Sequence, residues 1–537
     1  MPRSSSQTVR RVTSVNERIL HLADVLFQHG VRALFGVAGS GLSWQLITAM
    51  EQRGIPYWGV AHEAAGAIMA GAYGRQTGSL GCAISIKGPG LANMFPGIVS
   101  NHYEQMATLS ISEAYGPSSS RARMHKRLDH RGVLAGVVKA YVDLGDPAWT
   151  IARLAETAKS EIPGPVHLDL TPEEGARSEL FGHESGESAD PAPVWDRLQR
   201  LIERSAKPAV LVGSLTTRSE WGPRLATLSV PIFATVAAKG VVDETRPYAA
   251  GIFTGDGKRL APESVILKEA DCIVGLGLRN LEILTPRPFS VPLVLLDAAA
   301  DPRLTLGFNA TETLLSAKSL HFETVLELLR GKGWGEELVA KSQASLRSAL
   351  GAASWLPARL FAALETALPG ARCLVLDTGL FCTVAEHLWR VSKPAEFLAS
   401  ANGRYMGTGL PMALGAALAD RSRPTVCGVG DGGVRPYLAE FNLAIEEKLP
   451  LLLVLMSDGR YGSLAAAPSA AGLTSRAITL PRPSWRAAIG AMGCEAASVK
   501  TVDELTNCLR GWRREGPLFL ETRFDPDAYA AMTADLR

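Results

Sequence analysis

The sequence is poor in cysteine: only 7 of its 537 residues are cysteines, and no two of them form a C-x-x-C pair. The scattered positions and mostly apolar neighbours indicate small core residues in a reducing compartment. No spacing supports a cysteine nucleophile. The positions are Cys82, Cys272, Cys373, Cys382, Cys427, Cys494 and Cys508.

A charge excess and a long apolar run are also lacking. Lys plus Arg total 55 and Asp plus Glu total 53, so the net charge is +2, and no long basic run favours nucleic acid as a partner. The longest apolar stretch, Leu449 to Met456, is far shorter than the ~20 residues that cross a bilayer. Residues 1–18 lack the apolar middle of a signal peptide. We therefore expect a cytoplasmic protein with no membrane partner.

The length and the 47% apolar content, in contrast, suit a large globular protein with roughly three domains. A shift to Gly, Glu, Ser, Asp and Pro between Ser178 and Pro193 is typical of a linker. We expect an N-terminal domain at 1–180, a central domain at 190–350 and a C-terminal domain at 355–537.

Short apolar runs alternate with helical stretches in all three parts. Such runs, covered by helices on both faces, predict parallel strands and an α/β fold of three doubly wound parallel-sheet domains. The expected strands are 33–37, 57–60, 82–86, 108–111 and 166–170, then 209–212, 231–234, 272–276 and 293–297, then 373–376, 425–429, 451–456 and 518–521.

Two aspartates follow two successive expected strands late in the chain. Asp431 follows the strand 425–429 and Asp458 follows the strand 451–456, with 436–447 as the connecting helix. Ligands collect at the carboxyl ends of parallel strands, so both carboxylates can face one crevice. Mg²⁺ prefers such oxygen ligands and usually shares them with a phosphate group.

Glycines surround the first of these aspartates. Gly430, Gly432 and Gly433 allow the backbone to approach closely and to turn its N–H groups toward an anion. A Gly-Asp-Gly tripeptide alone is equally typical of a strand-to-helix turn whose aspartate caps the helix. The Asp-Gly-x-Tyr-Gly segment at 458–462 favours the ligand site.

A single glutamate carries the early motif. Glu63 follows a short apolar strand and begins a helix that is rich in alanine and glycine. A carboxylate at the start of so closely packed a helix is poorly hydrated, so its protonation responds to whatever it touches. The alternative is a surface residue that complements the helix dipole.

The late segment, Gly430 to Gly462, resembles the cofactor signature of thiamine diphosphate enzymes of the acetolactate synthase, benzoylformate decarboxylase and pyruvate decarboxylase group. This resemblance implies that Asp431, Asp458 and the backbone carbonyl of Arg460 bind Mg²⁺. The chain has Ser457-Asp458 where that group usually has Asn-Asn. The extra negative charge should tighten cation binding and repel the diphosphate.

The early segment, His62 to Arg75, resembles the H-E-x-x-A-x-x-x-A-x-G-Y-A-R segment of the same group. There the glutamate, Glu63 here, hydrogen-bonds the pyrimidine ring of thiamine diphosphate and favours its imino tautomer, through which the cofactor loses its thiazolium proton. The first domain would thus bind the pyrimidine and the third the diphosphate. The other cofactor contacts that the resemblance implies are Gly379, Leu380, the Arg404 backbone, Met406, Gly430, Gly432, Gly433 and Tyr461.

The resemblance extends over nearly the whole chain. Further segments that match the group in order are 35–40, 88–93, 164–169, 207–208, 230–231, 239–241 and 405–416. In that group the site is completed between the first domain of one subunit and the third of its partner. We therefore expect a homodimer at minimum and, as is common among these enzymes, a homotetramer.

Three residues are candidates for contact with the substrate. Ser40 matches a serine that contacts the substrate carboxylate in benzoylformate decarboxylase, although it equally suits a helix cap. Lys87 either points inward to a second anionic group or is solvated. His102 suits proton transfer near neutral pH, although a histidine there is more often only packed. Glu104-Gln105-Met106-Ala107 replaces a common Asp and Pro, and the histidine pair of pyruvate decarboxylase is not seen, which disfavours simple pyruvate decarboxylation.

The function that follows from the resemblance is addition of the cofactor carbanion to a 2-oxo acid and loss of CO₂. The enamine is then protonated or passed to an acceptor, so decarboxylase and carboligase both stay open. The alternative is a non-catalytic protein that keeps the fold in a structural or regulatory role. A flavin (FAD) in the central domain, as in acetolactate synthase, is unsupported, because no phosphate-type glycine fingerprint occurs there.

Overall fold

A computed structural model describes residues 16–116, 119–120, 122, 124–144, 147–172, 178–180, 192–352, 355–464 and 475–537. Most of the expected linker between 178 and 193 lies outside these residues. The chain divides into two compact units. The first contains residues 1–74, 78–99 and 106–181, and the second contains 75–77, 100–105 and 182–537.

The first unit is built on a sheet with the strand order β2-β1-β3-β4-β6-β5-β7. All neighbours are parallel except β7, which pairs antiparallel with β5. The strands are β1 Leu34–Gly36, β2 Tyr57–Gly59, β3 Gly81–Ser85, β4 Thr108–Glu113, β5 Ala140–Asp143, β6 Pro165–Leu170 and β7 Ser178–Leu180.

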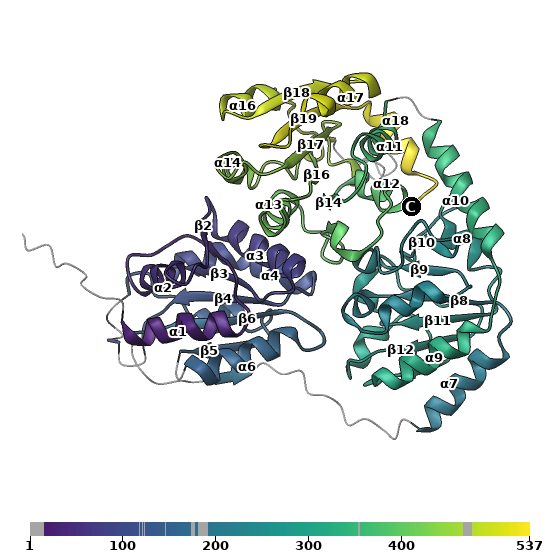
Figure 1. Cartoon of the computed structure of the whole chain (residues 1–537), viewed down its shortest axis with the longest axis horizontal. Helices are drawn as coiled ribbons and strands as arrows, with labels where there is room; N and C mark the ends of the chain where they lie inside the picture. The colour runs from purple at the N-terminus through teal and green to yellow at the C-terminus, as the bar shows by residue number, and fades with distance from the viewer. Residues whose placement is uncertain are drawn as a thin grey trace, which may run out of the picture. The chain divides into compact units, whose positions relative to one another are not determined.

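Helices cover both faces of this sheet. Helix α1 packs against α2 and α6, and Figure 1 shows α3 and α4 on the opposite face. Right-handed crossovers require this division, because the chain reverses its direction across the sheet after β2. The helices are α1 Glu17–Gln28, α2 Leu42–Glu51, α3 Glu63–Thr77, α4 Pro89–Tyr103, α5 His130–Leu134 and α6 Pro147–Lys159.

The second unit contains two six-stranded parallel sheets. The first has the order β10-β9-β8-β11-β12-β13, with α7 and α9 packed together and α8 and α10 packed together. Its strands are β8 Pro208–Val212, β9 Ile232–Ala234, β10 Ala249–Ile252, β11 Cys272–Leu276, β12 Leu293–Leu296 and β13 Glu312–Leu314. Its helices are α7 Ala192–Arg204, α8 Pro262–Ile266, α9 Ser319–Arg330 and α10 Glu336–Gly351.

The other sheet of this unit has the order β15-β14-β16-β17-β19-β18. Its strands are β14 Cys373–Leu376, β15 Phe397–Ala399, β16 Thr425–Gly430, β17 Leu451–Ser457, β18 Glu495–Val499 and β19 Leu518–Arg523. Helices α13 and α14 pack together, while α11 packs with α12 and α17 (Figure 1). The helices are α11 Pro357–Ala367, α12 Leu380–Leu388, α13 Gly409–Ala419, α14 Phe441–Glu446, α16 Trp485–Ala491, α17 Val502–Gly511 and α18 Pro526–Thr533.

The three sheets confirm the predicted fold class of three doubly wound α/β layers. Every expected strand is present within a few residues of its predicted ends. One helix differs: the expected helix 436–447 is a short 3-10 turn, Leu438–Glu440, followed by α14. Among the described helices, none has both the length and the apolar character that a membrane crossing needs.

The cysteines lie in the cores, as predicted. Six are buried and Cys508 is partly buried, and none forms a disulfide. Burial raises the pKa of Cys382 to about 11 and that of Cys494 to about 12. Such thiols hold no thiolate at neutral pH, so the structure gives no support to a cysteine nucleophile.

Candidate functional site

The two aspartates of the late motif come from adjacent strands. Strands β16 and β17 are parallel neighbours, and Gly430 lies opposite Met456 in their register. Asp431 directly follows β16 and Asp458 directly follows β17. Both residues are buried, with only 1% and 6% of their surface exposed. The sheet therefore delivers two carboxylates to one edge, as the sequence predicted.

Short polar contacts hold the Asp431 carboxylate. Its Oδ1 accepts a hydrogen bond from Ser457 Oγ at 2.9 Å, and its Oδ2 accepts one from the Gly459 N–H at 2.8 Å. The Asp458 Oδ1 accepts one from the Arg460 N–H at 3.1 Å. Burial raises the pKa of Asp458, and the charge of Asp431 adds to that shift. A hard divalent cation between the two carboxylates would offset this repulsion.

A narrow cavity of about 70 Å³ opens beside these aspartates. Its lining includes every residue that the sequence predicted for the cofactor in this part of the chain except Arg404. The predicted residues are Gly379, Leu380, Met406, Gly430, Asp431, Gly432, Gly433, Asp458, Arg460 and Tyr461.

Glycines make room for a ligand at this edge. A Cβ on Gly432 would lie 2.6 Å from Tyr461 Cε1 and 2.8 Å from Met406 Sδ, so a side chain there would displace these two lining residues. Helix α12 begins next to the cavity. Its N-cap residue is Gly379, so no side chain of that residue caps the first N–H groups of the helix. The first N–H groups of α12 are thus available to an anion. This backbone cradle and the two carboxylates fit a diphosphate bound with Mg²⁺.

The loop that carries Met406 is fixed by a buried aspartate that the sequence analysis did not single out. Asp377 follows β14 and accepts hydrogen bonds from the N–H groups of Gly407, at 3.0 Å, and Gly409, at 3.3 Å. Burial raises the pKa of Asp377 to about 6. Met406 lines the cavity and is 38% exposed. An apolar side chain held open in this way suits a ligand surface.

Arg404 lies outside the cavity lining, and its side chain points toward α12. Its Nη1 donates to Glu386 Oε1 at 2.6 Å, and Glu386 is wholly buried. Arg537 pairs with the other oxygen of Glu386. Arg404 has a φ of +47°, in the left-handed region. The ion pair therefore fixes an unusual backbone conformation at the residue whose backbone was predicted to meet the cofactor.

A second buried carboxylate organises the loop before Arg404. Glu104 Oε2 accepts hydrogen bonds from the N–H groups of Ala401, at 3.0 Å, and Asn402, at 3.2 Å. Its Oε1 accepts one from Gly403 N–H at 3.0 Å. Burial raises the pKa of Glu104, and these three donors oppose that shift. The departure at Glu104 that the sequence analysis noted thus has a structural role in this loop.

Replacing Glu104 by Ala should lower the free energy of unfolding by about 2–4 kcal/mol, because it leaves buried backbone N–H groups without acceptors. Glu104→Gln keeps one acceptor oxygen and should cost less. Denaturant unfolding of both variants measures the difference, with exposed Glu515→Ala as the control. Equal stability of Glu104→Ala and the control would contradict this role.

In the first unit, Glu63 is the first residue of α3 and only 7% of it is exposed. His62 is the N-cap, and its Nδ1 accepts a hydrogen bond from the Ala64 N–H at 3.2 Å. The Glu63 Oε2 accepts one from Asn93 Nδ2, on α4, at 3.1 Å. The alternative of a solvated surface glutamate is therefore wrong. Asn93 lies in one of the segments that resemble the family, 88–93, but had no predicted role.

Lys87 is linked to the start of α2 through Glu113, a carboxylate that the sequence analysis did not identify. Lys87 Nζ donates to Glu113 Oε2 at 2.9 Å, so Lys87 is paired rather than freely solvated. The other oxygen of Glu113 accepts from the Ser43 N–H at 3.0 Å, at the start of α2. Ser40 is exposed, and the N-cap of α2 is Gly41, so the helix-cap alternative for Ser40 is wrong.

His102 lies in the last turn of α4 and is exposed. Its ring meets that of Tyr103 edge-on, with the ring centroids 5.8 Å apart. It lines neither the cavity beside Asp431 nor the larger cavity of the first unit. A role for His102 in proton transfer therefore gains no support from its position.

The larger cavity has a volume of about 580 Å³ and opens at the carboxyl edge of the first sheet. Its walls combine cationic and anionic side chains. They include Lys87, Tyr115, Lys126, Arg127, Asp129, His130, Tyr141, Asp143 and Asp169.

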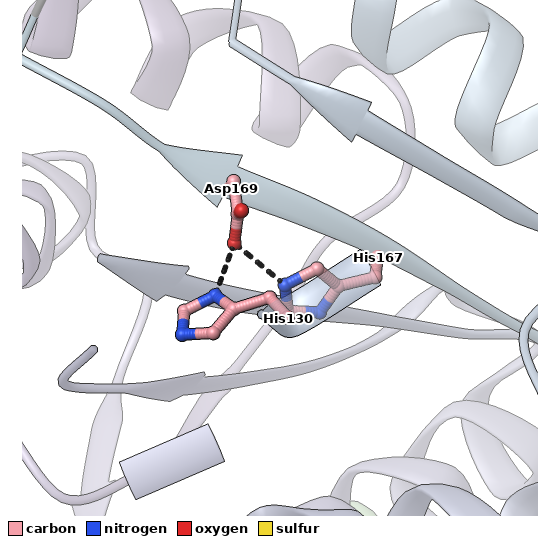
Figure 2. A group of neighbouring side chains, drawn as sticks. All are labelled: His130, His167 and Asp169. Atoms are coloured by element: carbon pink, nitrogen blue, oxygen red, sulfur yellow. Dashed lines mark hydrogen bonds and ion pairs between the residues drawn. The ribbon is translucent and has the colours of Figure 1, made fainter. Parts of the chain in front are cut away.

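A buried polar cluster forms part of this wall (Figure 2). Asp169 Oδ1 lies within hydrogen-bond distance of two ring nitrogens, His130 Nδ1 at 2.7 Å and His167 Nε2 at 3.1 Å. Tyr141 Oη donates to the other oxygen of Asp169. Ser110 Oγ lies 2.8 Å from the remaining ring nitrogen of His167. Burial alone would raise the pKa of Asp169, but the hydrogen bonds from both histidines outweigh it and lower the pKa.

Asp169 should therefore contribute to stability in a pH-dependent way. The folded state binds the proton of Asp169 more weakly than the unfolded state, so the stabilisation is present above about pH 4 and is lost as the pH falls below it. Unfolding free energies of the wild type and Asp169→Asn should differ more at about pH 6 than at about pH 3. A difference that is constant over this range would contradict the assignment.

The carboxyl edge of the central sheet is occupied by the chain itself. Glu282 accepts hydrogen bonds from the Ser214 N–H at 2.8 Å and from Gln105 Nε2 at 3.2 Å. Arg279 donates to Gln105 Oε1 at 3.2 Å and pairs with Asp297 at 2.7 Å. A dinucleotide in such a fold would bind at this edge, where β8, β11 and β12 end. Buried protein side chains fill this edge of the central sheet.

Three family descriptions match the chain in order. They are the thiamine pyrophosphate enzyme N-terminal TPP binding domain over residues 20–132, the central domain over 195–297 and the C-terminal TPP binding domain over 377–522. The last match contains both aspartates of the cavity, and the first contains Glu63.

Curated relatives align over most of the chain. A probable 2-ketoarginine decarboxylase from Pseudomonas aeruginosa is 26% identical over 94% of this chain and 93% of its own length. An acetolactate synthase large subunit from Pyropia yezoensis is 24% identical over 84% of this chain and 82% of its own. A putative thiamine pyrophosphate-containing protein from Bacillus subtilis is 22% identical over 90% of this chain and 87% of its own length. Together with the three domain matches and the three sheets, this shows that the chain belongs to the thiamine pyrophosphate enzyme family.

Proposed function

We propose that the protein is a thiamine diphosphate- and Mg²⁺-dependent enzyme that acts on a 2-oxo acid. The observation that carries the proposal is the pair of buried carboxylates, Asp431 and Asp458, at the ends of adjacent strands beside a glycine-lined cavity. The buried Glu63 at the start of α3 supports it. Both features resemble the family's cofactor residues in order, and Glu63 and Asp431 also in type, whereas Asp458 stands where an asparagine is usual.

The residues present fit this cofactor. Asp431, Asp458 and the Arg460 carbonyl would hold Mg²⁺, and the start of α12 with Gly430, Gly432 and Gly433 would receive the diphosphate. Bound thiamine diphosphate supplies a carbon nucleophile and an electron sink. Glu63 would exchange a proton with the pyrimidine ring, and Asn93 would hold the Glu63 carboxylate in place for that exchange. Met406 would present its exposed side chain to the cofactor.

The outcome after loss of CO₂ is either protonation or transfer to an acceptor. One relative carries the name of a decarboxylase and another that of an acetolactate synthase. Because the chain aligns with both over most of their length, the similarity supports a decarboxylase and a carboligase equally. The non-catalytic alternative is less favoured, because the motifs of Glu63 and Asp431 are both retained.

We also propose a homodimer as the smallest active unit and a homotetramer as the full assembly, in which Glu63 of one copy serves the cofactor held by Asp431 of another. The resemblance of the first and third domains to the pyrimidine- and diphosphate-binding domains supports this arrangement.

A flavin is not part of the proposal. The buried network of Glu282, Gln105 and Arg279 occupies the edge at which a dinucleotide would bind, and the Glu282 carboxylate would repel a phosphate. The purified protein should therefore show no flavin absorption in the visible range.

Reconstitution with thiamine diphosphate and Mg²⁺, followed by measurement of CO₂ release from a panel of 2-oxo acids, tests the proposed function. We expect release from at least one acid, and a parallel assay for condensed products separates carboligase from decarboxylase. The panel should include acids with a second carboxylate and acids with a cationic side chain, because Lys87, Arg127 and Asp129 all line the larger cavity. Cofactor binding without CO₂ release from any acid would instead favour the non-catalytic alternative.

A further inference from the structure

The polar cluster around Asp169 is connected to the backbone of a functional turn. His130 Nε2 accepts a hydrogen bond from the N–H of Gly88 at 3.0 Å. Gly88 has a φ of +65°, and a Cβ there would lie 2.2 Å from the Lys126 carbonyl oxygen. The Gly88 carbonyl accepts the first helical hydrogen bond of α4, from the Ala92 N–H at 2.9 Å. One residue therefore joins the cluster to the start of this helix.

The Gly88 contact determines which ring nitrogen of His130 carries the proton. Because a backbone N–H can only donate, His130 Nε2 must be the accepting nitrogen, and in the neutral ring the proton lies on Nδ1. That proton points to Asp169 Oδ1, 2.7 Å away. Asp169 is therefore the ionised acceptor, and it also accepts a hydrogen bond from Tyr141 Oη.

The Gly88 contact also disfavours a metal ion in the cluster. His130, His167 and Asp169 place one ligand atom each within 4.8 Å of one another, a spacing at which a metal could bind. A metal on His130 Nδ1 would move the ring proton to Nε2, directly opposite the Gly88 N–H. Two donors would then face each other at 3.0 Å. The cluster is thus a hydrogen-bonded support with the order Asp169, His130, Gly88.

The turn that this support holds leads to Glu63. Asn93 lies on the first turns of α4, five residues after Gly88, and its Nδ2 donates to the Glu63 carboxylate at 3.1 Å. Lys87 immediately precedes Gly88 and pairs with Glu113 at 2.9 Å. A shift of the Gly88 turn would displace both side chains at once.

We infer that Asp169 and His130 are positioning residues: through the Gly88 N–H they fix the start of α4, and thereby hold Asn93 against the Glu63 carboxylate. The consequence for catalysis rests on the proposed function, whereas the support of the turn does not. A misplacement of about 1 Å at a reacting group can cost roughly 100-fold in rate, so the effect of losing this support should be measurable.

The test compares His130→Phe, which removes both hydrogen bonds, with His130→Gln, whose amide can accept from Gly88 and donate to Asp169. Hydrogen–deuterium exchange is measured on the peptide that contains Gly88, in the protein without cofactor. We expect exchange to rise roughly 10-fold in His130→Phe and to stay near the wild-type rate in His130→Gln. The matched control is His321→Phe, since His321 accepts a backbone hydrogen bond from Lys318 N–H in the central domain.

The kinetic readout is the split between kcat and cofactor affinity. His130→Phe should lower kcat roughly 10- to 100-fold with little change in the dissociation constant of thiamine diphosphate, and His130→Gln should restore kcat. If His130→Phe does not fold, Asp169→Asn, which retains one acceptor oxygen, should raise the exchange rate by a smaller factor.

The inference would be overturned by wild-type exchange at the Gly88 peptide in folded His130→Phe, or by an equal loss of kcat in His130→Phe and His130→Gln. Raised exchange in a protein whose wild type releases no CO₂ from any 2-oxo acid would confirm the support of the turn and refute only the proposed function.

Discussion

The Glu63→Gln variant is expected to bind thiamine diphosphate and Mg²⁺ with near wild-type affinity and to lose turnover by about 10²- to 10⁴-fold. Glutamine has nearly the same shape and can still accept the hydrogen bond from Asn93. It cannot take up or release a proton at the pyrimidine ring. The variant thus removes the proposed proton exchange and leaves the polar contacts of the buried site in place.

The direct measurement is the rate at which the thiazolium ring proton of the bound cofactor exchanges with deuterium. We expect this rate to collapse in Glu63→Gln while calorimetric titration shows unchanged cofactor binding. Glu51→Gln is the matched control, because Glu51 is an exposed carboxylate at the end of the neighbouring helix α2. A normal exchange rate in Glu63→Gln would show that Glu63 has another role.

The second large effect is expected for Asp431→Ala. The substitution removes a proposed Mg²⁺ ligand and leaves Ser457 Oγ and the Gly459 N–H without their acceptor. We expect Mg²⁺ affinity to fall by at least about 100-fold, and the affinity for thiamine diphosphate to fall with it, because the ion would anchor the diphosphate in the proposed site. Titration of the cofactor at several Mg²⁺ concentrations measures both. Unchanged cofactor affinity would contradict the proposed anchor.

Asp458→Asn provides the contrasting variant. It retains an oxygen ligand and removes one of two buried negative charges, whose repulsion contributes to the raised pKa of Asp458. Mg²⁺ should bind more weakly than in the wild type, whereas the diphosphate at saturating Mg²⁺ should bind more tightly. A fall in both affinities to the level of Asp431→Ala would mean that charge at position 458 does not act against the diphosphate.

Most of the fold was predictable because its central strands are continuous apolar runs. Strands β11, β16 and β17 are buried along nearly their whole length, which leaves an apolar stretch in the sequence. The strands that the sequence analysis missed, β5, β7, β10, β13, β15 and β18, are short and lie at or next to a sheet edge. Strand β18 has a mainly exposed or half-exposed pattern, so no apolar run marks it.

The candidate site was predictable where its residues lie next to one another in the sequence. The glycines and aspartates of the late motif follow two strong strands, so their positions at one edge follow from parallel pairing. The supporting carboxylates were not accessible in this way. Asp377 follows β14, Glu113 ends β4 and Asp169 lies near the end of β6. Their partners are backbone N–H groups or side chains from distant segments, which only the folded chain reveals.

The alternatives for the substrate-facing residues show the same limit. Glycine and serine in Gly39-Ser40-Gly41 both suit a helix start, and only the backbone shows that the helix begins after Gly41. For Lys87, an inward and an outward orientation were equally compatible with the sequence. The structure gives a third outcome, an ion pair with Glu113 at the rim of the larger cavity.

The central claim is that Glu63 of one copy and Asp431 of another serve the same cofactor. It is tested most directly by mixing Glu63→Gln with Asp431→Ala, each inactive alone, after dissociation and reassembly. With random pairing, half of the dimers are mixed, and each mixed dimer has one intact site of its two. The account therefore predicts recovery of about a quarter of the wild-type CO₂ release. No recovery from a mixture that demonstrably contains mixed dimers would contradict it.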